Sequence, residues 1–182
     1  MSKKQELASW IKTLVFAVVI ALIIRTFLFT NYIVEGESMM PTMHDGDRLI
    51  VNKIAYKLDK PERFDIVVFH VDRGADYIKR VIGLPGDEIA YRNDTLYVNG
   101  EPVEEPYLED YKEEVGNRLL TENFTLDEII GQKTVPENTV FVLGDNRMNS
   151  TDSRMIGVVP ISQIVGEVNI KYWPLSDFRF FH

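Results

Sequence analysis

The chain has 182 residues, room for one domain and a short additional segment, and 45% of them are hydrophobic, as is typical of a globular protein. It contains no cysteine, which excludes disulfide bonds, cysteine-based metal sites and a cysteine nucleophile. The formal net charge of −8 argues against nucleic acid as a general partner.

The first predicted element is a transmembrane anchor at residues 10–30, which follows a cytoplasmic tail at residues 1–9. The uninterrupted apolar part of the anchor covers residues 14–24. Because a spanning helix needs about 20 residues, the segment can cross a bilayer if Lys12 and Arg25 reach opposite interfaces.

Charges on the two sides of this segment predict its orientation. Lys3, Lys4 and Lys12 lie at its start, whereas the first charges after it are Glu35 and Glu37, so we expect the N-terminus in the cytoplasm. A cleavable signal peptide and a buried core helix are the alternatives. We favour an uncleaved anchor, because no small-x-small cleavage site follows the apolar core and no polar stripe marks a soluble helix.

Residues 31–182 are predicted to form an extracytoplasmic, mainly β domain. Short runs rich in β-branched and aromatic residues alternate with turn signals, and Asn93-Asp94 is a predicted hairpin turn. Few helical stretches separate these runs, which favours a coiled antiparallel β-sheet over βαβ units. The predicted strands are residues 48–52, 65–71, 77–82, 87–92, 95–98, 139–143 and 164–173.

An acidic insert at about residues 101–135 interrupts this pattern. Up to residue 128 it carries ten acidic side chains and only two basic ones, Lys112 and Arg118, whereas the rest of the chain is balanced in charge. Residues 124–131 within it are predicted to form a short helix. The insert is either a solvated surface or a docking surface for a basic partner, and the solvated surface is the simpler interpretation.

Histidine chemistry is not indicated by this sequence. His70 lies within a strand-like run, His44 follows a turn, and His182 is the last residue. None has the spacing of a metal-binding set, and none is placed to predict a Ser-His-Asp triad. We therefore expect neither a metal nor another cofactor.

A neutral lysine is the other group that can activate a serine. The ordinary pKa of lysine is about 10.4, and burial can lower it by up to ~3–5 units. Lys79 lies in a predicted strand and Ser38 in a loop shortly after the predicted anchor. Taken alone, these residues equally allow an exposed strand lysine and an incidental serine.

Three long motifs in this sequence each resemble a motif of one protein family. GESMMPTM at residues 36–43 resembles the nucleophile motif of type I signal peptidases, and YIKRVIGLPGD at residues 77–87 resembles their general-base motif. GDNRMNSTDSR at residues 144–154 resembles the third box of the same family. The motifs occur in the family's order, and the short chain with one anchor is similar to the enzymes of Gram-positive bacteria.

The resemblance implies a Ser/Lys dyad in which Ser38 is the nucleophile and Lys79 the general base. Ser150 would accept a hydrogen bond from the lysine amine and orient it. Four charged residues would form pairs that hold the catalytic strands together, although the resemblance does not assign the partners. These residues are Arg80, Asp145, Asp152 and Arg154.

One position departs from the family pattern. Some members carry a serine two residues before the nucleophile, where its hydroxyl helps to stabilise the oxyanion, and this chain has Gly36 there. The backbone N–H of Ser38 would then carry more of the oxyanion stabilisation.

The implied function is that of a membrane-bound signal (leader) peptidase I, which cleaves signal peptides from exported preproteins after a small-x-small site. Secretory preproteins and the lipid bilayer would be its partners, and the secretion translocon is a further candidate. The C-terminal aromatic residues either contact the membrane or pack in the core, and we expect Tyr172 and Trp173 in the core. A self-cleaving Ser/Lys domain of the repressor type and a non-enzymatic membrane-tethered β domain are the alternatives.

Overall fold

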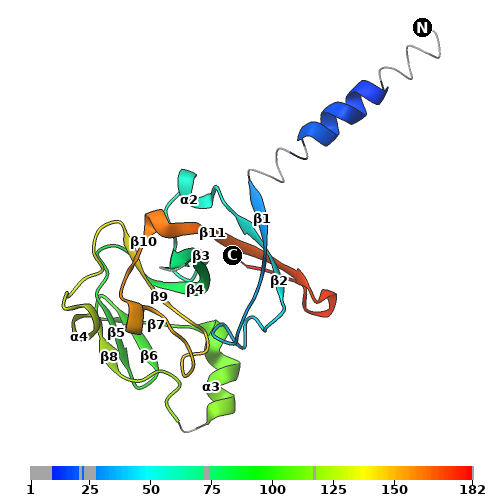
Figure 1. Ribbon diagram of the computed structural model, residues 1–182. Coiled ribbons are helices and arrows are strands. Elements are labelled where there is room, and N and C mark those ends of the chain that lie inside the picture. Colours follow the sequence, from blue (N-terminus) through cyan, green and yellow to red (C-terminus); the bar gives the residue numbers. More distant parts are fainter. Residues whose placement is uncertain (1–9, 21, 23–27, 72–73, 117, 182) are drawn as a thin grey trace, which may run out of the picture.

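Two antiparallel sheets make up the body of the protein, and a helical segment projects from it (Figure 1). The computed structural model describes residues 10–20, 22, 28–71, 74–116 and 118–181. Strand pairs throughout the body are antiparallel, which confirms the predicted mainly β, antiparallel fold.

The larger sheet brings strands from both ends of the chain together, because β2 pairs with β11. Its first strand, β1, lies at one edge and is paired on one side only. In spatial order the strands are β1 (Phe29–Ile33), β2 (Arg48–Asn52), β11 (Ile164–Trp173), β3 (Ile66–Val71), β4 (Ala75–Gly83), β9 (Thr139–Leu143) and β10 (Val159–Pro160), and β12 (Arg179–Phe180) also pairs with β11.

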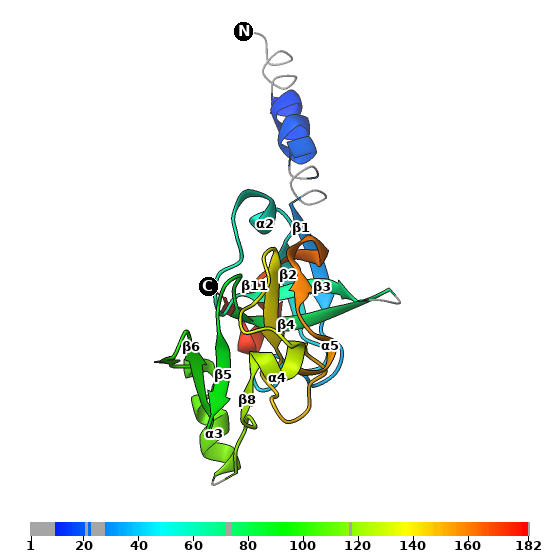
Figure 2. The same cartoon turned by 90° about the vertical axis from the view of Figure 1, so that its left-hand side faces the viewer.

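The smaller sheet lies with helix α3 at the end of the body opposite the projecting helix (Figure 2). Its strands, in spatial order, are β7 (Glu101–Val103), β6 (Thr95–Val98), β5 (Ile89–Arg92) and β8 (Phe124–Thr125). The helices of the body are α2 (Ala55–Leu58), α3 (Glu109–Val115), α4 (Leu126–Ile130) and α5 (Ser153–Ile156), with short 3-10 turns η1 (Pro106–Leu108), η2 (Ile161–Gln163) and η3 (Leu175–Asp177).

All seven predicted strands are present, and none of their ends is displaced by more than two residues. The predicted hairpin turn is also present, since Asn93 and Asp94 both have positive φ between β5 and β6. Apart from β1, the strands that the sequence did not predict have two or three residues, and β7 and β10 contain Pro102 and Pro160, which weaken a strand signal.

Buried side chains cover both faces of the larger sheet near its centre. On β3, Val68 packs in one hydrophobic cluster, whereas Val67 and Phe69 pack in another. On β4, every residue from Lys79 to Gly83 is buried. Lys79 is therefore not an exposed strand lysine, because only 3% of it is accessible to solvent.

The predicted anchor is described only in part. Residues 10–20 and 22 are helical, whereas residues 21 and 23–27 and the predicted tail at 1–9 lie outside the described residues. Among the described residues, no helix has the length and apolarity needed to span a membrane. The predicted C-terminal end of the anchor is wrong, because Phe29 and Thr30 belong to β1 and pair with β2.

The acidic insert is more ordered than its sequence suggests, since it contains β7, η1, α3, β8 and α4. The predicted helix is confirmed as α4, where Thr125 and Glu128 form a reciprocal capping box. Nine of the ten acidic side chains are exposed, as a solvated surface requires, and Glu105 is buried.

The C-terminal aromatic residues are less buried than predicted. Tyr172 is half-buried, but Trp173 is 48% exposed, so its placement in the core is wrong. Trp173 is the last residue of β11 and is followed by Pro174, so the chain leaves the sheet there. The guanidinium of Arg48 lies 5.8 Å from the centre of the Trp173 ring.

Candidate active site

Ser38 lies in a loop that connects β1 with β2, which we call the Ser38 loop (residues 34–47). Met39 and Met43 are fully buried and fix this loop to the core. Gly36 has a φ of +86°, which favours glycine, and its N–H donates to the Asp45 carboxylate at 2.7 Å. The position that departs from the motif's pattern is thus part of a tight backbone turn.

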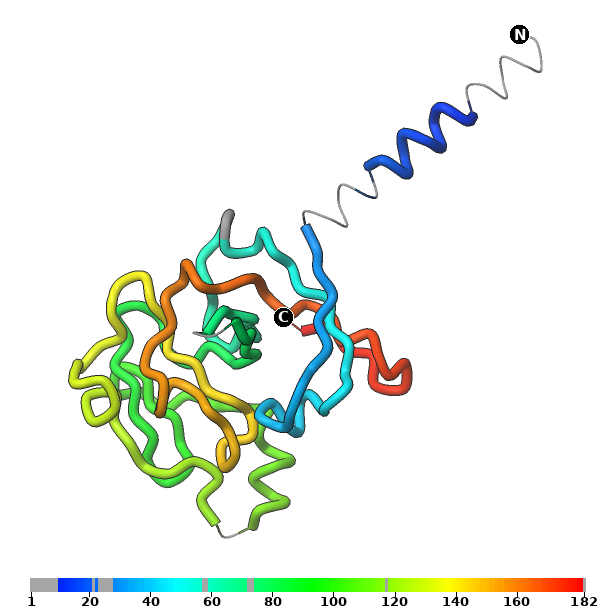
Figure 3. Tube along the Cα trace, in the orientation of Figure 1, coloured from blue at the N-terminus to red at the C-terminus, as the bar shows by residue number. Residues whose placement is uncertain are grey.

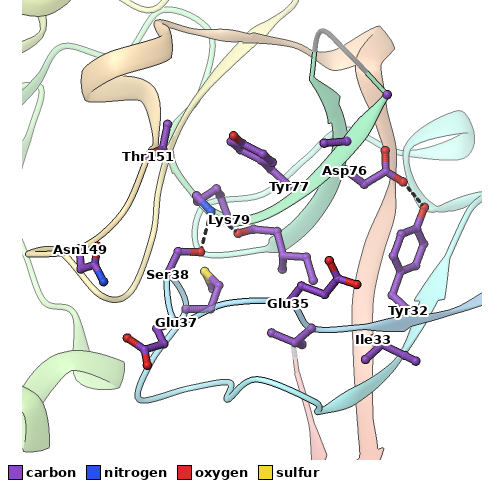
Figure 4. A pocket seen from close by; sticks show the side chains of 15 residues that line it. Tyr32, Ile33, Glu35, Glu37, Ser38, Asp76, Tyr77, Lys79, Asn149 and Thr151 are labelled. Carbon is purple, nitrogen blue, oxygen red and sulfur yellow. Dashed lines mark hydrogen bonds between the residues drawn. The ribbon is translucent and has the colours of Figure 1, made fainter.

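Lys79 reaches the Ser38 hydroxyl from β4 (Figure 4). Its Nζ donates to Ser38 Oγ at 2.8 Å and to the carbonyl of Ile78 at 2.9 Å. The amine also lies 5.1 Å from the centre of the Tyr77 ring. Ser38 and Lys79, which are 41 residues apart in the sequence, are therefore in direct contact.

Burial makes Lys79 a much weaker base than an ordinary lysine. Loss of hydration lowers the pKa of Lys79 to about 8, against opposing attraction from Asp152 and Asp145. About a tenth of the amine is then neutral at pH 7, and this neutral form can accept a proton from the hydroxyl that it contacts.

The structure assigns the charge pairs that the sequence left open. Arg80 donates to both carboxylate oxygens of Asp145, at 2.9 and 2.6 Å. Arg154 donates to both oxygens of Asp152, at 2.9 and 2.8 Å. Thr42 of the Ser38 loop also donates to Asp145 at 2.5 Å, so this carboxylate joins β4 to the loop.

Ser150 does not make the predicted hydrogen bond to Lys79. Its Oγ is buried and has no hydrogen-bond partner among the described residues, because Lys79 Nζ is directed at Ser38 and Ile78. Ser150 instead lies against Gly144. A Cβ at residue 144 would lie 2.2 Å from Ser150 Oγ and 2.5 Å from the carbonyl oxygen of Ser38.

Residues 144–147, which we call the 144–147 turn, support the Ser38 loop directly. The backbone N–H of Asn146 donates to the Ser38 carbonyl at 3.0 Å, and its side chain donates to the Glu37 carbonyl at 3.1 Å. In the chain trace, the Ser38 loop and this turn lie beside each other (Figure 3). No role was predicted for Gly144, Asn146 or Thr42, although all three lie within the three motifs.

The backbone N–H of Ser38 is available to a bound substrate. No hydrogen bond among the described residues uses it as a donor. This is the donor that the sequence predicted for an oxyanion, and it lies beside the hydroxyl that would attack.

A cleft of about 710 Å³ opens in front of the two side chains. One wall comes from the end of β1 and the Ser38 loop, and the other comes from residues 74–79. Both walls offer a free strand edge. β1 is an edge strand of its sheet, and residues 75–79 of β4 precede the part of β4 that pairs with β9, which begins at Arg80. Such a cleft suits an extended peptide.

The two described histidines, His44 and His70, form no hydrogen bond with Ser38 or Lys79. The exposed His70 contacts Asp76, which also accepts a hydrogen bond from Tyr32 at 2.7 Å. His44 lies near two carboxylates, Asp47 and Asp177, in an arrangement with the spacing of a metal site. The Nζ of Lys171, however, forms ion pairs with both carboxylates, so a cation already occupies the position beside them.

Comparison with known proteins identifies the family of this chain. Residues 7–173 match the family model described as "Signal peptidase, peptidase S26". A signal peptidase I of Bacillus caldolyticus is 55% identical over 164 residues, which cover 90% of each chain. A signal peptidase IB of Staphylococcus aureus (strain MRSA252) is 42% identical over 97% of this chain and 95% of its own.

A solved structure is also similar. The crystal structure of a signal peptidase I from Enterococcus faecalis V583 is 47% identical in sequence and superposes with a TM-score of 0.57, covering 60% of this chain and 97% of that one. The family model, the relatives and the fold all agree, and the chain therefore belongs to the signal peptidase family, peptidase S26.

Proposed function

We propose that this serine endopeptidase of the signal peptidase family uses Ser38 as its nucleophile and neutral Lys79 as its general base. The observation that carries the proposal is the contact of 2.8 Å between Lys79 Nζ and Ser38 Oγ, made by an amine that is 3% exposed. Membership of the family supports the cleavage of signal peptides as the reaction.

The reaction proceeds through an acyl-enzyme. Lys79 takes the proton of Ser38 Oγ while the oxygen attacks the carbonyl carbon of the scissile bond. The Ser38 N–H donates to the resulting oxyanion, and Lys79 then gives the proton to the leaving amine as the C–N bond breaks. A water that loses its proton to Lys79 attacks the ester and releases the signal peptide, with Ser38 restored.

The substrate lies extended between the two free strand edges of the cleft. Alternate side chains of an extended peptide point to the same face, so two residues separated by one position face the wall of the cleft while the residue between them faces away. The side chains of Val34, Met39 and Ile78 line the wall near Ser38. An apolar wall that accepts only small side chains at alternate positions would select a small-x-small site.

The supporting residues keep the dyad in place. Asp145 connects Arg80, the neighbour of Lys79, to Thr42 of the Ser38 loop. Asp152 accepts from the N–H of Gly144 at 3.0 Å and so fixes the start of the 144–147 turn. Ser150 is proposed to orient the amine during the reaction, since a buried hydroxyl without a partner costs about 1–3 kcal/mol, which such a bond would recover.

The chain is proposed to be a single-pass membrane protein with its N-terminus in the cytoplasm and its β-rich body, which begins with β1, outside. The apolar, exposed helix at residues 10–20 supports an anchor. Exposed Phe29 and Ile33 on β1 and exposed Trp173 at the end of β11 suit a body that lies close to the bilayer. The secretion translocon remains a predicted partner.

Cleavage by the full-length chain in detergent micelles tests the proposed function. Incubation with a preprotein is expected to give one cut after a small-x-small site, and Ser38→Ala, purified in the same way, is expected to give none. Cleavage that persists in Ser38→Ala would refute the assignment of the nucleophile. No observation favours repressor-type self-cleavage or a non-enzymatic role over this function.

A further inference from the structure

We infer that the acidic insert is a positioning element of the active site: Glu105, Tyr107 and Tyr111 hold the 144–147 turn, and this turn holds the Ser38 loop. The inference rests on the proposed function and extends it to a part of the chain that lines none of the cleft.

Glu105 is set apart from the other acidic residues of the insert by its burial. Its carboxylate accepts from Arg147 Nη2 at 2.5 Å, and the exposed fractions of the two side chains are 1% and 0%. Removing one partner from a buried pair leaves the other charge unpaired, which a protein tolerates poorly. The pair therefore joins the insert to the 144–147 turn with high directional specificity.

The guanidinium of Arg147 uses all five of its N–H donors. Nε donates to the carbonyl of Gly144 at 3.0 Å, which closes the turn on itself. The other four donors reach the smaller sheet and the insert. Their acceptors are Glu105 Oε1, Tyr91 OH, Tyr107 OH and Thr121 Oγ1.

A second contact runs from the insert to the residue beside the general base. The guanidinium carbon of Arg80 lies 3.9 Å from the centre of the Tyr107 ring, and Tyr107 OH donates to Glu105 at 2.7 Å. Arg80 also forms the ion pair with Asp145. One side chain of the insert thus covers the arginine that follows Lys79.

A third contact connects the insert to the Ser38 loop through Asn146. Tyr111 of α3 donates to the side-chain carbonyl of Asn146 at 3.3 Å. The same amide donates to the Glu37 carbonyl, and the Asn146 backbone donates to the Ser38 carbonyl. The insert therefore fixes the orientation of the Asn146 side-chain amide, which supports the Glu37 carbonyl, and so holds the residue whose backbone N–H supports Ser38.

These contacts matter because the dyad depends on one short hydrogen bond. A displacement of about 1 Å at reacting groups can lower a rate about 10²-fold. A looser turn would move Ser38 relative to Lys79 and would also admit water to the buried amine. Loss of the insert contacts should therefore change both the rate and the protonation of Lys79.

Glu105→Gln tests the inference, because it keeps the shape of the side chain and removes its charge. We expect kcat for preprotein cleavage to fall about tenfold with KM within about twofold, and the rising limb of the pH profile to move to higher pH. Asp87→Asn is the matched control, since it weakens the 3.0 Å pair with Arg63, which contacts no part of the 144–147 turn. This control should keep kcat within about twofold.

Hydrogen exchange gives a readout that does not depend on the substrate. Glu105→Gln should speed exchange at the Asn146 N–H, which is bonded to the Ser38 carbonyl, and Asp87→Asn should not. Tyr111→Phe removes a single hydroxyl and serves as a milder second variant, with a two- to threefold loss of kcat expected, in case Glu105→Gln does not fold.

Two results would overturn the inference: equal losses of kcat in Glu105→Gln and Asp87→Asn, or a normal rate, pH profile and Asn146 exchange in Glu105→Gln and Tyr111→Phe. Wild type and Ser38→Ala in the same assay separate this failure from failure of the proposed function. Absence of Ser38-dependent cleavage by wild type would refute the proposed function, whereas the exchange data would still decide whether the insert fixes the turn.

Discussion

Two buried lysines in this molecule differ in what surrounds them. Lys79 is 3% exposed and Lys171 is 0% exposed, so burial alone does not distinguish them. The Nζ of Lys171 forms ion pairs with Asp47, at 3.2 Å, and with Asp177. Lys79 forms no ion pair with a described carboxylate and instead contacts the hydroxyl of Ser38.

The difference arises from where the arginines are. Asp145 and Asp152 lie near enough to Lys79 to raise its pKa, but Arg80 and Arg154 neutralise much of their charge. Desolvation then dominates, and the pKa of Lys79 falls. The carboxylates near Lys79 are thus already held bidentately by arginines, whereas at Lys171 the amine itself forms the ion pairs.

The largest expected effect comes from making the side chain at residue 79 permanently charged. Lys79→Arg should lower cleavage by about 10⁴-fold or more, because a guanidinium stays protonated at any usable pH and cannot accept the proton of Ser38. Single-turnover rates of this variant beside wild type measure the effect. Substantial activity would mean that Lys79 acts as a charge and that the two lysines are alike.

Lys171, in contrast, should contribute to the stability of the fold. Lys171→Met should lower the free energy of unfolding by about 3–5 kcal/mol, since it leaves Asp47 buried without its partner. Urea titration at pH 7 measures the change, and retained cleavage by the folded fraction is the control. An unchanged midpoint and m-value would show that the cluster around Lys171 contributes little.

The same substitution at Lys79 should change the free energy of unfolding in the opposite direction. The pKa of Lys79 is lower in the folded chain than in the unfolded one, so its protonation opposes folding. Lys79→Met should stabilise the protein by about 1–3 kcal/mol below pH 8. The gain should shrink as the pH rises from about 8 to about 10.5, where wild type loses this proton even when unfolded. A destabilised Lys79→Met at pH 7 would contradict this environment for Lys79.

The sequence predicted most of the sheet because its strands have strong local signals. β2, β6, β9 and β11 have the predicted bounds, each a run of β-forming residues that ends at a turn signal. β1 was not predicted, because its first residues continue the apolar pattern of the segment before it. The Ser38–Lys79 pair was found through the motifs, not through composition.

Contacts between distant residues could not be derived from local signals. Arg80 pairs with Asp145, 65 residues away, whereas Arg154 pairs with Asp152 two residues before it, and nothing in their spacing distinguishes these choices. Glu105 has the same chemistry as nine exposed neighbours in the insert, and only the tertiary fold shows that it is buried against Arg147. Ser150 was predicted to contact Lys79, and the structure does not contain this contact.

The smallest expected effect concerns the protonation of Lys79 in the free enzyme. Because the neutral amine is the active form, kcat/KM should rise with pH, about tenfold per pH unit well below the pKa, and level off above about pH 8.

Asp152→Asn sharpens this test. Among the nearby carboxylates, Asp152 raises the pKa of Lys79 most, so its removal should move the rising limb of the pH profile to lower pH. This direction is opposite to that expected for Glu105→Gln. The plateau should also fall, because the Asp152 carboxylate accepts the N–H of Gly144. A limb that stays in place while the plateau falls would show that Asp152 acts on the position of the turn alone. A shift to lower pH would show that the paired carboxylate still acts on the lysine.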